Sequence, residues 1–115
     1  MTFEVRHYVT AAGADPFAEW FAALADRQAQ ARVQARIDRV ESGLLGDTEF
    51  CGESVWELRI DWGPGYRVYY ARSGERIILL FLGGDKRKQQ ADIEQAKEYW
   101  RDYQQRTKTQ GKRSR

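Results

Sequence analysis

The sequence has very few residues that bind metals or form disulfide bonds. Its 115 residues include one cysteine, Cys51, and one histidine, His7. A single cysteine excludes an internal disulfide, and one cysteine with one histidine is too few for a zinc site. A catalytic thiol would also need a histidine positioned beside it. We therefore predict no metal and no cofactor, a packing role for Cys51, and a packed or edge position for His7.

The sequence also lacks long apolar segments. The longest, residues 77–82, has only the length of a strand, whereas a membrane-spanning helix needs about 20 apolar residues. The first residues lack the charged start and the long apolar run of a signal peptide. These absences predict a cytoplasmic protein without membrane association.

The net charge is small, but it is unevenly distributed. The chain carries +2 overall, while residues 86–115 contain ten lysines and arginines against four acidic residues. Such asymmetry indicates a polyanionic partner for this region. We expect a single domain over residues 1–106, followed by a basic, flexible tail over residues 107–115. This tail would either contact RNA or aid solubility.

The N-terminal part of the chain predicts a strand followed by a helical hairpin. Residues 3–10 alternate apolar and polar side chains, as a half-buried strand does. Asp15 is suited to cap a helix that has Pro16 at its first position. A second helical pattern extends to Leu44, where glycines are expected to end the helix. Residues 47–54 are expected to form a loop.

The C-terminal part predicts three strands and a helix. Residues 55–62 and 66–72 alternate strictly, and the glycine- and proline-rich turn between them predicts adjacent antiparallel strands. Residues 76–82 are apolar at nearly every position, which is typical of a central strand covered on both faces. We expect Gly83 and Gly84 to end this strand, before a last helix.

The predicted order of elements is therefore β-α-α-β-β-β-α. This order indicates an α+β fold with a small antiparallel sheet, an N-terminal αα-hairpin and a C-terminal helix. We expect the helices to cover mainly one face of the sheet. The other face would then carry the polar groups that the strands present.

Two arginines are predicted to lie side by side on the more polar face of the sheet. Arg59 and Arg67 occupy strands joined by a short turn, and neighbouring strands lie about 4.8 Å apart. Their guanidinium groups could therefore converge on one anion. Glu57 and Asp61 lie on the same face by alternation, so a cross-strand ladder of salt bridges is the other interpretation.

Three consecutive cations, Lys86, Arg87 and Lys88, follow the last predicted strand. Helix N-termini favour anions, so cations at this position indicate a bound phosphate. The other interpretation is a solvated turn in which Asp85 caps the helix.

Aromatic residues crowd the same strands as the two arginines. Cations mixed with aromatics suit single-stranded RNA, whose bases stack while its phosphates pair with arginine and lysine. Trp56 and Trp62 share the apolar face and are expected in the core. Tyr69, on the other face, is the better candidate for an exposed role.

Taken together, the blocks "VWELRID", "GPGYRVYYAR" and "LLFLGGDKRKQQADIEQAKEYW" resemble the RelE/ParE superfamily of toxins from type II toxin–antitoxin systems. The resemblance is closest to its HigB-like branch, the addiction module killer proteins related to phage Gp49 proteins. It covers nearly the whole chain and implies a RelE-like fold. It also implies a metal-independent, ribosome-dependent endoribonuclease that cleaves translated mRNA.

The resemblance also implies roles for individual residues. Arg59 of the ELR block, Arg67 of the GYR block and Lys86 of the GGDK block would be catalytic groups that bind phosphate and stabilise the transition state. Proton-transfer groups vary in the family, so Tyr69, Tyr70 and Asp85 are candidates by residue type alone. We assign Tyr69 to the catalytic set. The remaining RNA-binding candidates are Arg72, Arg87, Lys88 and Tyr70.

One departure from the family pattern concerns the GGDK block. Small polar residues usually follow it, whereas Arg87 and Lys88 stand there in this chain. They add positive charge, and the pattern leaves their role open.

The resemblance implies partners as well. Such toxins act on the ribosome and its mRNA, and a small antitoxin holds them inactive. In this branch the antitoxin is commonly a helix-turn-helix protein that represses its operon, so operator DNA would be contacted only through it. Two other readings remain open. One is a non-catalytic toxin, such as a ParE-like gyrase inhibitor or a degenerate copy that only binds its antitoxin. The other is a generic basic RNA-binding module.

Overall fold

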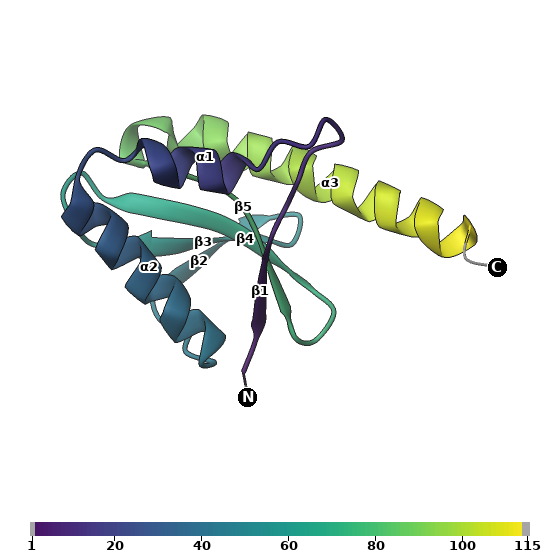
Figure 1. Ribbon diagram of the computed structural model, residues 1–115, viewed down its shortest axis with the longest axis horizontal. Coiled ribbons are helices and arrows are strands. Elements are labelled where there is room, and N and C mark those ends of the chain that lie inside the picture. The colour runs from purple at the N-terminus through teal and green to yellow at the C-terminus, as the bar shows by residue number, and fades with distance from the viewer. Residues whose placement is uncertain (1, 114–115) are drawn as a thin grey trace.

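The computed structural model describes residues 2–113, with side chains through residue 108. It shows a five-stranded sheet with helices packed on it (Figure 1). The elements in chain order are β1 (Glu4–His7), α1 (Pro16–Ala23), α2 (Arg27–Glu41), β2 (Thr48–Gly52), β3 (Val55–Ile60), β4 (Tyr66–Ser73), β5 (Ile77–Asp85), the short 3-10 helix η1 (Lys86–Lys88) and α3 (Gln89–Arg113).

The sheet confirms the predicted α+β class. Its strand order is β1-β5-β4-β3-β2. The pairs β3–β4 and β4–β5 are antiparallel, as predicted, and β2 adds a third antiparallel pair with β3. The N-terminal strand β1 joins the other edge in parallel with β5, with Glu4 opposite Ile77. The helical hairpin connects β1 to β2, which lies at the opposite edge of the sheet, and the three antiparallel pairs then lead back to β5 beside β1.

One strand is absent from the predicted order. Residues 47–54 were expected to be a loop, but Thr48–Gly52 form β2. This strand lies at the edge of the sheet, and Glu49 and Phe50 are both exposed. Because neither side chain is covered, the segment lacks the alternation that marks a half-buried strand.

The helices cover both faces of the sheet, so the prediction of one covered face is wrong. On one face, α1 and α2 contribute Phe17 and Val33 to a core with Val68 of β4. On the other face, α3 contributes Trp100 to a second core with Phe81 of β5. Figure 1 shows α3 on the side of the sheet away from α2. The unbroken apolar run of β5 already fits this arrangement, because both of its faces are buried.

The αα-hairpin forms where it was predicted, with one difference in length. The side chain of Asp15 accepts a hydrogen bond from the backbone N–H of Ala18, and Pro16 is the first helical residue. The second helix ends at Glu41 rather than extending to Leu44, which is exposed.

Gly83 and Gly84 do not end β5, contrary to the prediction, because the strand continues to Asp85. They lie where α1 and α3 approach the strand from its two faces. A Cβ atom on Gly83 would lie 2.3 Å from the Trp20 ring, and one on Gly84 would lie 2.0 Å from Oδ2 of Asp92. The two glycines therefore permit close helix–strand packing.

The backbone of α3 remains helical through Arg113. The expected basic tail, residues 107–115, thus begins as helix, and residues 114–115 lie outside the described residues. The boundary of the tail stays a prediction. Within residues 2–113, none of the helices combines the length and the apolar character that crossing a membrane requires.

Candidate functional site

Three of the predicted site residues line one hollow at the end of the sheet. Arg59 of β3 and Arg67 of β4 lie directly opposite each other in the antiparallel register. Lys86 joins them because its backbone N–H donates to the carbonyl of Gly65, at 3.1 Å. The hollow has a volume of about 400 Å³, and all three cations line it. The sequence therefore brings three cations from two strands and a 3-10 helix to one surface.

The turn between β3 and β4 shapes this hollow. Gly63 and Gly65 adopt φ values of 55° and 83°, which glycine reaches without strain. The backbone N–H of Gly65 donates to the carbonyl of Trp62 at 3.0 Å and closes the turn. This turn places Asp61 at the rim of the hollow, beside the arginines.

Each arginine also has a carboxylate partner. Nη1 of Arg59 lies 3.0 Å from Glu49, and its Nε lies 3.8 Å from Asp47. Nε of Arg67 lies 3.2 Å from Glu57. The structure thus contains both the convergence of the two arginines and cross-strand salt bridges. The sequence analysis missed both carboxylates because β2, which contains Glu49 and directly follows Asp47, was not recognised as a strand.

Glu57 is a buried carboxylate beneath the site. Only 1% of this residue is exposed. It accepts hydrogen bonds from Nε of Arg67, from Nε2 of Gln89 at 3.1 Å and from Sγ of Cys51 at 3.7 Å. Because Gln89 is the first residue of α3, this carboxylate links that helix to both central strands.

The environment of Cys51 agrees with a packing role. Burial and the nearby charge of Glu57 raise the pKa of the thiol to about 12. A thiol with such a pKa is protonated at neutral pH, and it is therefore a weak nucleophile.

The three cations of η1 do not share one surface. Lys86 is exposed, and its side chain forms no ion pair with the residues that the structure describes. Arg87 pairs with Asp85 at 2.8 Å, and Asp85 also caps η1 by accepting from the backbone N–H of Arg87. The side-chain hydrogen bond from Arg87 lowers the pKa of Asp85. Arg87 and Lys88 line a different hollow, beside Trp20.

The expected exposed role of Tyr69 is wrong. Its side chain is fully buried under α3, and its hydroxyl has no hydrogen-bond partner among the described residues. Burial raises its pKa. Tyr70 is also buried, on the opposite face, where its hydroxyl lies 2.9 Å from Oγ1 of Thr48. Neither side chain is exposed at the surface, and their proposed roles toward RNA stay predictions.

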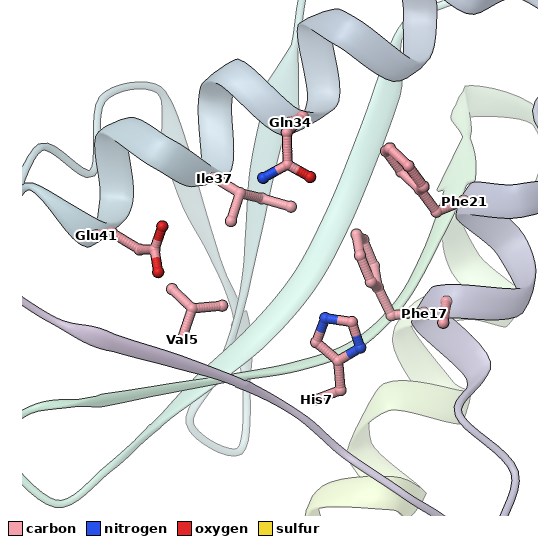
Figure 2. A pocket seen from close by; sticks show the side chains of 8 residues that line it. Val5, His7, Phe17, Phe21, Gln34, Ile37 and Glu41 are labelled. Atoms are coloured by element: carbon pink, nitrogen blue, oxygen red, sulfur yellow. The ribbon is translucent and has the colours of Figure 1, made fainter.

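Two further predicted residues lie away from the cationic hollow. Arg72 is exposed near the other end of β4, where it donates to the carbonyl of Glu75 and lies over the Phe3 ring. His7 lies at the sheet edge, as expected, with Nδ1 2.7 Å from Asp15. It lines a pocket between β1, α1 and α2 (Figure 2).

The described residues contain no group of three or more side chains placed to hold a metal ion. What they provide at the hollow is positive charge held in place by carboxylates. Such a surface has the charge and the hydrogen-bond donors that an anion requires.

Comparisons with known proteins cover the segment that contains this site. The profile of one family, described as "Phage derived protein Gp49-like (DUF891)", matches residues 19–101. An "Uncharacterized protein" of Haemophilus influenzae is 38% identical over 97 residues, which are 84% of this chain and 92% of that protein. The family match includes Arg59, Arg67 and Lys86.

Proposed function

We propose a function for a chain that belongs to the family of phage-derived Gp49-like proteins, which is associated with addiction-module toxins of the RelE superfamily. Membership suggests the toxin of a toxin–antitoxin pair and implies an antitoxin partner. The finer proposal is a HigB-like, ribosome-dependent endoribonuclease that cleaves translated mRNA in the cytoplasm.

One observation carries this proposal. Arg59 and Arg67 face each other across two strands and line a single hollow with Lys86. Carboxylates pair with both arginines, and an anion bound between the three cations would further offset their mutual repulsion. An RNA phosphodiester matches the hydrogen-bonding geometry of the two guanidinium groups.

In the proposed reaction the RNA supplies its own nucleophile. The ribose 2′-oxygen attacks the adjacent phosphorus, and the bond from phosphorus to the 5′-oxygen of the next nucleotide breaks. The products are a 2′,3′-cyclic phosphate and a free 5′-hydroxyl. Negative charge grows on the phosphoryl oxygens in the transition state, where Arg59 and Arg67 stabilise it. Glu57 holds Arg67 in place beforehand, so little reorganisation is needed.

The two protons of this reaction need an acceptor and a donor. Asp61 lines the hollow and forms no ion pair with the described residues, so we assign it as the acceptor of the 2′-hydroxyl proton. The ammonium of Lys86 would neutralise the departing 5′-oxygen and supply its proton. Because the nucleophile belongs to the substrate, this route requires no metal and no cofactor.

The proposed partners follow from this assignment. The substrate would be mRNA on the ribosome, and the inhibitor would be a helix-turn-helix antitoxin. Co-purification with the product of the neighbouring gene tests the second point, and recovery of the toxin alone at equal expression would contradict it.

Primer extension on a translated message after induction tests the nuclease. Lys86→Ala is the most direct variant, because the side chain is exposed and its loss leaves no buried carboxylate unpaired. Loss of one charge-stabilising group lowers such a rate by roughly 10²–10³-fold. We therefore expect new 5′ ends with the wild-type protein and their near loss with Lys86→Ala and Arg67→Ala.

Arg76→Ala is the matched control, because Arg76 is also exposed but lies at the turn between β4 and β5. It should cleave like the wild type. Growth arrest without new 5′ ends would overturn the nuclease proposal. If DNA-damage signalling accompanied that arrest, the result would favour a gyrase inhibitor. RNA binding without growth arrest would instead favour a generic RNA-binding module.

A further inference from the structure

A second basic groove adjoins the proposed site. It lies between α2 and β3 and has a volume of about 260 Å³. Arg59 and Asp61 line both this groove and the cationic hollow. The two depressions therefore meet at Arg59, with the hollow on one side and α2 on the other.

Arginines outnumber carboxylates in the lining of this groove, although Arg59 also pairs with Glu49 and Asp47 outside it. Four arginines line it against one carboxylate, Asp61. Three of the arginines, Arg32, Arg36 and Arg39, come from one face of α2. None of these three forms an ion pair with the residues that the structure describes. Like charges three and four residues apart destabilise a helix unless an anion binds them.

Arg36 is a buried residue in the lining of the groove. This residue is only 8% exposed, and its guanidinium packs against Gly46. Its one hydrogen bond to the described residues runs from Nη2 to the backbone carbonyl of Asp47, at 2.7 Å. Burial and the charge of Arg39 lower its pKa. A buried cation without a bonded carboxylate is stabilised by any anion that approaches it.

Arg32 is held in a fixed orientation on the same wall. Its guanidinium lies 4.1 Å from the centroid of the Trp62 ring, which gives a cation–π contact. Nε1 of Trp62 donates to Asp26 at 3.3 Å and so fixes the ring. Arg39 is exposed one turn from Arg36 and is free to complete the groove.

We infer that the groove between α2 and β3 is a second phosphate subsite, which binds another phosphate of the RNA strand whose scissile phosphate lies in the hollow. This inference rests on the proposed function, since it needs an RNA in the hollow. Arg59 stands between the two phosphates. The strand would run from the turn between β3 and β4 across Arg59 toward the C-terminal half of α2.

Binding of an uncleavable probe tests this inference independently of catalysis. The probe is a 2′-O-methyl RNA oligonucleotide of mixed sequence, and its affinity for the full-length protein is measured by fluorescence anisotropy over a range of salt concentrations. Each phosphate contact on a single strand contributes about 0.7 to the slope of log K against log salt. We expect Arg39→Ala to reduce that slope by this amount and to weaken binding severalfold at low salt.

Arg27→Ala is the matched control. Arg27 is an exposed arginine of the same helix, but it does not line the groove. It should leave both the affinity and the slope unchanged. Because Arg39 and Arg27 are both exposed, neither variant should disturb the core, and circular dichroism checks this for each.

Three outcomes would overturn the inference. The first is an unchanged slope for Arg39→Ala, and the second is an equal loss for Arg27→Ala. The third is a loss of antitoxin binding by Arg39→Ala with RNA binding intact, which would assign the groove to an acidic segment of a protein. Primer extension tests the proposed nuclease activity independently of this binding measurement. Cleavage by the wild type with an unchanged slope for Arg39→Ala would remove only the second subsite.

Discussion

Nε of Arg67 lies 3.2 Å from Oε2 of Glu57, a carboxylate that is almost fully buried between the sheet and α3. The side chain of Arg67 is itself only 12% exposed. Arg67 therefore reaches the hollow from a fixed position, and the buried carboxylate of Glu57 balances its charge. This pairing makes Glu57 a positioning residue for the cationic site.

The first prediction concerns this buried pair. Glu57→Gln keeps the shape of the side chain but removes the charge that holds Arg67. We expect a loss of about 1–3 kcal/mol in the free energy of unfolding, as for other hydrogen bonds to buried charged groups. Urea denaturation measures this loss, and primer extension should show reduced cleavage.

Glu49→Gln is the control for this prediction, because Glu49 is the exposed partner of Arg59. Exposed ion pairs contribute only about 0–1 kcal/mol. Equal destabilisation by the two substitutions would contradict a special role for Glu57.

The second prediction concerns the close packing at Gly83. A methyl group there would lie 2.3 Å from the Trp20 ring, so the ring or the strand must shift. We expect Gly83→Ala to destabilise the protein by about 1–3 kcal/mol, the usual range for overpacking. In a Trp20→Leu background the same substitution should cost less. A double-mutant cycle by urea denaturation measures the difference, and full additivity would contradict the contact.

The third prediction concerns pH and the carboxyl group of Asp92. Burial raises its pKa above the ordinary value of 3.8, and its Oδ2 has no hydrogen-bond partner among the described residues. The folded state therefore holds this proton more tightly than the unfolded state does. Consequently, the contribution of Asp92 to stability falls as pH rises from about the unfolded value through the folded pKa.

Urea denaturation of the wild type and of Asp92→Asn over pH 4 to 7 measures this effect. The amide does not titrate, so the stability of the wild type relative to the variant should decrease with rising pH. A difference that is constant, or that increases with pH, would show that the carboxyl group is not desolvated.

The fourth prediction concerns Tyr69, whose hydroxyl is buried without a partner. Tyr69→Phe removes that hydroxyl, so we expect unchanged or slightly higher stability and unchanged cleavage. Tyr70→Phe is the control, because it loses the contact with Thr48 and should cost about 1 kcal/mol. A loss of cleavage with Tyr69→Phe would instead support the catalytic role that the sequence suggested.

Alternation along the strands correctly predicted the placement of the two arginines. It placed Arg59 and Arg67 on one face, and the short turn between their strands made them neighbours. The capping pair Asp15 and Pro16 likewise needed only local chemistry. Such features depend on residues that are close in sequence, so the sequence alone is sufficient to predict them.

Alternation could not predict how deeply each side chain is buried. Tyr69 shares a face with Arg67, yet α3 covers the tyrosine completely, whereas the arginine lines the hollow. The extent of that cover depends on where the helix packs, which is a tertiary property. Gly83 was misassigned as a strand end for the same reason. Its role is to leave room for Trp20 of α1, and that contact is also a tertiary property. The edge strand β2 was missed because its exposed residues carry no pattern of burial.

The parallel pairing of β1 with β5 has a kinetic consequence. It pairs Glu4 with Ile77, so β1 can join the sheet only after β5 has been synthesised. Contacts between residues so distant in sequence raise the contact order of a domain and slow its folding. Until β1 docks, the outer edge of β5 is an open template for another strand. The time that the four residues of β1 take to dock therefore sets how long this edge of a newly made chain is prone to aggregate.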